Sequence, residues 1–158
     1  MGVQISSPMG DSSVAPKHEF DLEAARRVLP LVRAIVSDLA RLQQRVEDRE
    51  ARLEGFISGR ELTPGDPYAD ELAQMQADIA ADKTRVREFI RELRDLGVVP
   101  DLADVRVVRF PAMVDDEPSW FCWRLGQPDV DYWMRRGADD GDWQPIHTES
   151  LEQDPSNR

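Results

Sequence analysis

Residues 72–96 read LAQMQADIAADKTRVREFIRELRDL, and their apolar pattern indicates the fold class. Apolar residues recur in it at alternating steps of three and four, the heptad spacing of a helix that packs along another helix. Asp82 is the only polar residue at these positions, and Gly97 follows where a C-cap glycine belongs. We therefore predict a long amphipathic helix that ends at about Leu96. Its seam consists of Leu72, Met75, Ile79, Asp82, Val86, Phe89, Leu93 and Leu96.

A second long helix is predicted upstream of this one, beginning after Asp21, a favourable N-cap residue. Pro30 lies inside this helix, so we expect a kink near residues 25–29. Residues 58–67 are rich in Gly and Pro and separate the two helices. Matching seams and a short connection predict an antiparallel helical hairpin over residues 21–97. The first helix carries its apolar residues at Val28, Val32, Ile35, Leu39, Leu42, Val46, Leu53 and Phe56.

The segment from residue 104 to residue 146 changes to short β-like runs. Residues 105–110 form a β-branched run that we expect Pro111 to end. Residues 119–125 alternate between the two faces of a strand, and residues 130–134 suit a third strand. The sequence therefore predicts an α+β fold, a long antiparallel helical hairpin with a small C-terminal antiparallel β-meander packed against it.

The chain of 158 residues suits a single domain with two tails. We expect a disordered leader at residues 1–18, the domain at residues 19–146, and a disordered acidic tail at residues 147–158. The 31 Asp and Glu outnumber the 20 Lys and Arg, which gives a net charge of -11. This charge argues against nucleic-acid partners and anionic membranes. A lone cysteine and the lack of an export signal indicate a cytoplasmic protein.

Complete catalytic sets are absent from the sequence. It holds two histidines, neither at metal-ligand spacing, and no glycine-rich nucleotide-binding motif. Cys122 lies between Phe121 and Trp123, which is typical of a small buried residue. The acidic run at residues 139–142 lacks the later Glu of a calcium loop and suits a solvated turn. We therefore predict no metal or cofactor, and the sequence favours a non-enzymatic protein.

Seven of the eleven aromatic residues, including all four Trp, lie between Phe110 and Trp143. They form either the core of a small sheet, which we favour, or a platform for a ligand. Arg124 is close in sequence to Trp120 and Trp123 and is a candidate for a cation–π pair. If the segment binds a ligand, the candidate residues are Arg109, Arg124, Gln127, Trp133, Met134 and Trp143.

Several short motifs resemble those of the bacterial domain-of-unknown-function family 2203, over about residues 19–146. The resemblance is carried by Phe20-Asp21-Leu22-Glu23-Ala24-Ala25, Leu29-Pro30-Leu31, Leu96-Gly97-Val98, Phe110-Pro111-Ala112, Phe121-Cys122-Trp123-Arg124-Leu125-Gly126, Tyr132-Trp133 and Gln144-Pro145-Ile146. The Cys-Trp-Arg-Leu-Gly run and the Tyr-Trp pair are the most specific of these. The resemblance implies a fold but not a function, because the family has no assigned activity.

Four positions of the chain depart from the pattern that the resemblance implies. That pattern has Asp, Glu, His and Arg where this chain has Arg109, Gln127, Met134 and Trp143, respectively. Asp, Glu and His together suit a hard metal ion or acid–base chemistry. Arg, an amide and a thioether cannot replace them, so the resemblance implies that this chain has lost such a site.

Two function hypotheses remain from the sequence. The first is a non-enzymatic helical hairpin that forms homo-oligomers or binds another protein, motivated by the seam of residues 72–96. The second is a small-molecule or metal-binding domain, with a possible enzymatic role, whose site lies in the Trp- and Arg-rich C-terminal segment. A nucleic-acid site is disfavoured, because the arginines of that segment make only a modest basic patch.

Overall fold

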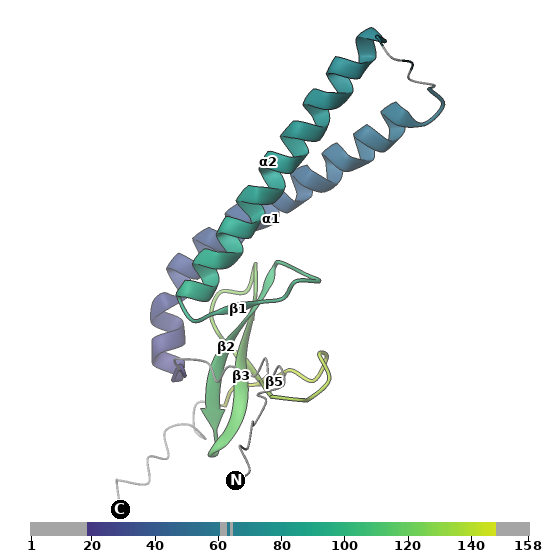
Figure 1. Ribbon diagram of the computed structural model, residues 1–158. Coiled ribbons are helices and arrows are strands. Elements are labelled where there is room, and N and C mark those ends of the chain that lie inside the picture. Colours follow the sequence, from purple (N-terminus) through teal and green to yellow (C-terminus); the bar gives the residue numbers. More distant parts are fainter. Residues whose placement is uncertain (1–18, 61–62, 64, 148–158) are drawn as a thin grey trace, which may run out of the picture.

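A computed structural model describes residues 19–60, 63 and 65–147 of the chain. The expected leader and residues 148–158 of the expected tail lie outside this part. Two long helices lead into a small antiparallel sheet at one end of the hairpin (Figure 1). The predicted α+β fold of helical hairpin and meander is confirmed. Among the described residues, none of the helices combines the length and the hydropathy of a membrane span.

Helix α1 spans Leu22–Ile57 and begins as its N-cap predicts. Asp21 Oδ1 accepts a hydrogen bond from the backbone N–H of Ala24 at 2.6 Å. Pro30 lies within the helix, and Figure 1 shows the first turns at an angle to the rest, in agreement with the expected kink. The helix ends at Ser58, and the following glycine takes a positive φ of 81°.

Helix α2 spans Pro67–Asp95 and ends in a Schellman motif. The backbone N–H of Val98 donates to the carbonyl of Leu93 at 3.0 Å, and both side chains are fully buried. Gly97 has a φ of 87°, a left-handed conformation that suits glycine. The predicted C-cap glycine is therefore confirmed.

The sheet is an antiparallel meander in which the strand order follows the sequence, β1-β2-β3-β4-β5. A two-residue turn joins the two long strands, with φ of 53° at Asp115 and 60° at Asp116, as in a type I′ hairpin. The strands are β1 (Val99–Pro100), β2 (Val107–Val114), β3 (Glu117–Arg124), β4 (Tyr132–Arg135) and β5 (Gln144–Pro145).

The expectation that Pro111 ends its strand is wrong, because β2 continues to Val114. The carbonyl of Pro111 accepts a hydrogen bond from the backbone N–H of Phe20 at 2.7 Å, so it faces away from β3. The missing N–H of proline lies on the same side and removes no bond to β3. The third strand begins at Tyr132 instead of residue 130.

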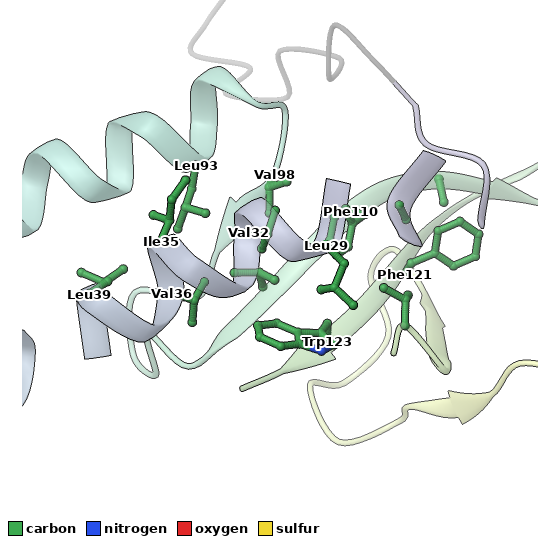
Figure 2. Close-up of a cluster of buried hydrophobic side chains, with 14 of the residues drawn as sticks. Leu29, Val32, Ile35, Val36, Leu39, Leu93, Val98, Phe110, Phe121 and Trp123 are labelled. Carbon is green, nitrogen blue, oxygen red and sulfur yellow. The ribbon is translucent and has the colours of Figure 1, made fainter. Parts of the chain in front are cut away.

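The hydrophobic core lies where α1, the end of α2 and the inner face of the sheet meet (Figure 2). Phe110, Phe121 and Trp123 point from the sheet toward the helices, and each is at most 2% exposed. The Trp123 indole N–H donates to the carbonyl of Gln127 at 3.0 Å. These rings therefore build the core, as the sequence favoured. The helix residues that complete it are Ala25, Leu29, Val32, Ile35, Val36, Leu39 and Leu93.

Candidate functional site

The sheet face opposite the helices carries an open hollow of about 400 Å³, which we call the outer-face hollow. Arg109 of β2 and Cys122 of β3 are paired in register, so both lie on this face. Phe110 and Phe121, one residue along each strand, lie in the core on the other face. The hollow is lined by Asp101, Asp104, Val107, Arg109, Arg124, Gln127, Asp140, Gly141 and Trp143.

Four of the six candidate ligand-binding residues line this hollow together, namely Arg109, Arg124, Gln127 and Trp143. The other two do not. Trp133 is paired with Phe121 on the helix-facing side and lines a separate hollow there. Met134 is 3% exposed and is paired with Trp120 on the outer face, but it does not line the hollow.

Arg109 lies between two carboxylates and is itself mostly buried. One of its guanidinium nitrogens, Nη2, is 3.1 Å from Asp101 Oδ2 and 3.2 Å from Asp140 Oδ1. The Arg109 side chain is 14% exposed, whereas that of Asp140 is 86% exposed. The two ion pairs therefore differ, because one is shielded from solvent and the other is open to it.

Asp101 is held in place by the loop that precedes β2. Its Oδ1 accepts hydrogen bonds from the backbone N–H groups of Ala103 at 2.8 Å and Asp104 at 3.2 Å. Burial opposes ionisation, but these two bonds and the Arg109 guanidinium outweigh it, so the pKa of Asp101 lies below its ordinary value. Asp101 is thus a fixed carboxylate in the wall of the hollow.

Arg124 pairs with Asp104 at 2.9 Å, and the expected cation–π pair of Arg124 with Trp120 or Trp123 is wrong. An arginine of α1 lies over the Trp123 ring, and the arginine that directly follows β4 lies over the Trp120 ring. The backbone N–H of Arg124 donates to Gln127 Oε1 at 3.0 Å, which fixes the Gln127 side chain at the rim.

Trp143 packs against Tyr132 with ring centroids 6.0 Å apart. Its indole Nε1 is buried, and no described residue accepts a hydrogen bond from it. Cys122 is fully buried, and burial raises the pKa of its thiol to about 12, so the thiol is neutral at physiological pH. The described residues include no cluster of His, Cys, Asp or Glu side chains placed to hold a metal ion.

The sequence did not point to the three acidic residues of the hollow, Asp101, Asp104 and Asp140. The first two follow Pro100 closely, and each is an Asp that accepts from the backbone N–H two residues on, so turn-forming residue types could have located the loop. Asp140 lies in a turn, as expected for residues 139–142. Nothing local in the sequence indicates that it contacts Arg109.

A second exposed surface is the end of the hairpin away from the sheet, residues 47–78, which we call the distal arm (Figure 1). No described residue of the arm is buried, although the apolar seam continues through it. Ile57 is 43% and Tyr68 47% exposed, and the Arg60 guanidinium lies 4.5 Å from the Phe56 and Tyr68 ring centroids. The partly exposed seam residues are Leu53, Phe56, Leu72 and Met75.

These features define an α+β hairpin-and-meander protein with a polar hollow on its sheet and an uncovered helical arm. The family model described as "Uncharacterized conserved protein (DUF2203)" matches residues 18–141. The chain therefore belongs to this family, as its motifs indicated. No curated protein and no solved structure matches the chain.

Proposed function

We propose that the protein is a non-enzymatic module that self-associates through its distal arm. One observation carries the proposal, namely that the apolar seam continues beyond the last buried residue of each helix. The buried residues of α1 end at Val46 and those of α2 begin at Ile79. The seam residues beyond them remain partly exposed in the single chain. An apolar stripe of this kind favours a partner that covers it.

A second copy of the chain suits this surface because two antiparallel hairpins can complete a four-helix bundle. Each copy would then place its own seam against that of its partner. The arm is acidic, however, with nine acidic and three basic residues between positions 47 and 78. Repulsion between the two arms therefore opposes association at low ionic strength, and salt screens it.

Light scattering coupled to size-exclusion chromatography tests the proposal over a range of protein and salt concentrations. We expect a dimer that becomes tighter as salt rises, because screening removes the repulsion between arms. At high salt, where the repulsion between the acidic arms is screened, Ile57→Lys should raise the dissociation constant about tenfold or more, because it places a charge in the proposed apolar interface.

Met113→Lys is the matched control, since Met113 lies on the sheet and is 42% exposed, close to the 43% of Ile57. This variant should associate like the unmodified chain. A chain that stays monomeric at every salt concentration contradicts the proposal. Equal effects of the two Lys variants also contradict it.

A further inference from the structure

We propose that the outer-face hollow binds a small compound carrying an oxyanion, a carboxylate or a phosphate, which Arg109 holds in the place of Asp140. This site is separate from the distal arm, and the proposal does not depend on self-association. It rests on the hydrogen-bonding groups of the hollow, on the unequal ion pairs of Arg109, and on the charge balance around them.

The unused hydrogen-bonding groups in the hollow are mostly donors. Among the described residues, Arg109 bonds only through Nη2, and its Nε and Nη1 have no acceptor. Arg124 uses one guanidinium nitrogen, Nη1, toward Asp104. Gln127 uses its amide oxygen, which leaves its amide NH₂ free of any described acceptor. Trp143 also lines the hollow, and its indole N–H is buried without a described acceptor.

The acceptors of the hollow, by contrast, are largely occupied. Asp101 accepts through both oxygens, from two backbone N–H groups and from Arg109. Asp104 also accepts through both, from the backbone N–H of Arg106 and from Arg124. A ligand that satisfies the remaining groups must therefore bring acceptors, and guanidinium donors pair best with a carboxylate or phosphate.

Asp140 is the group that such a ligand would replace. Its carboxylate contacts Arg109 from an exposed turn, and an ion pair with one open partner contributes little to stability. Asp101, the other partner of Arg109, is fixed by its backbone hydrogen bonds and stays. An oxyanion can thus exchange with Asp140 without dismantling the wall of the hollow.

The charge balance permits this exchange. Without Asp140, the hollow has two positive groups, Arg109 and Arg124, and two negative ones, Asp101 and Asp104. A singly charged anion then restores the charge that Asp140 supplies. Trp143 and Val107 line the same hollow, so a ligand with a flat apolar part gains contact area there.

Isothermal titration of the full chain with four probes tests the proposal. The probes are acetate, benzoate, inorganic phosphate and phenyl phosphate, which separate the oxyanion from the ring. We expect binding at millimolar concentrations. Benzoate should bind more tightly than acetate, and phenyl phosphate more tightly than inorganic phosphate. Comparison of the carboxylates with the phosphates then identifies which oxyanion the hollow prefers.

Asp140→Asn weakens the competing contact with Arg109 and should tighten binding about two- to fivefold. Asp139→Asn is the matched control, because it removes the same charge from the same exposed turn and Asp139 makes no described contact with Arg109. Arg109→Gln should abolish binding, whereas Arg106→Gln, a neighbouring exposed arginine, should not.

Two results overturn the proposal. One is that no probe binds either the unmodified chain or Asp140→Asn. The other is that Asp139→Asn and Asp140→Asn tighten binding equally, which would mean that only net charge matters. The comparison of the two Asn variants remains decisive if Arg109→Gln fails to fold.

Discussion

Asp82 is the polar residue in the seam of α2, and its partners lie on α1. It is 9% exposed and accepts hydrogen bonds from Arg49 at 2.6 Å and from Arg45 at 3.3 Å. No local pattern in the sequence indicates these contacts, because the two partners are 33 and 37 residues away. Both arginines still reach solvent, so they do not depend on Asp82 for hydration.

The conservative substitution Asp82→Asn should therefore cost more stability than the non-conservative Asp82→Leu. Asp82→Asn keeps the size but loses the charge attraction, and should lower the free energy of unfolding by about 1–2 kcal/mol. Asp82→Leu fills the seam with an apolar side chain while the arginines turn to water, so it should cost less than Asn or stabilise the chain. Urea unfolding followed by circular dichroism measures both, and a Leu variant less stable than the Asn variant contradicts this reasoning.

The residue contacts of the outer-face hollow could be only half predicted. Arg109, Arg124, Gln127 and Trp143 were chosen from sequence and do line it. Their partners were missed because Asp140 lies 31 residues from Arg109, and Asp104 lies 20 residues from Arg124. Such pairs are set by the register of the meander, which no local pattern reveals.

Among the elements, a glycine just after the end of α2 and a glycine inside α1 should respond oppositely to substitution by alanine. Gly97 has a φ of 87° at the end of α2, so Gly97→Ala should cost about 1–2 kcal/mol of stability. Gly55 lies within α1, and apart from the backbone of its own helix and its two chain neighbours no atom lies within 4 Å of where its Cβ would be, so Gly55→Ala should gain about 0.5–1 kcal/mol. Thermal unfolding of both variants checks the signs, and a destabilised Gly55→Ala would contradict the argument.

The helices were predictable because their signals are local. A cap such as Asp21 or Gly97 and a regular apolar spacing act within a few residues. Strands β1 and β5 have only two residues each, which is too short to show the alternation of apolar and polar residues typical of a strand. The prediction that Pro111 ends its strand was wrong for a different reason, because the effect of a proline depends on which side of β2 is paired.

At the scale of the whole molecule, the core and the distal arm are separable. The core cluster draws on α1 only as far as Leu39 and on α2 only from Val86 onward. All four Trp lie beyond residue 119, in the meander and its loops. The structure therefore places the arm outside the contacts that hold the sheet to the hairpin.

Replacing residues 47–78 with a short flexible loop should leave a cooperatively folding protein. Val46 and Ile79 remain as the last buried residues of the shortened hairpin, and the core cluster is untouched. The near-ultraviolet circular dichroism of the four Trp should match that of the full chain, since their packing does not involve the arm. Self-association should be lost while oxyanion binding at the outer-face hollow persists. A variant with a broad, non-cooperative thermal transition would mean instead that the arm contributes to the stability of the core through helix propagation.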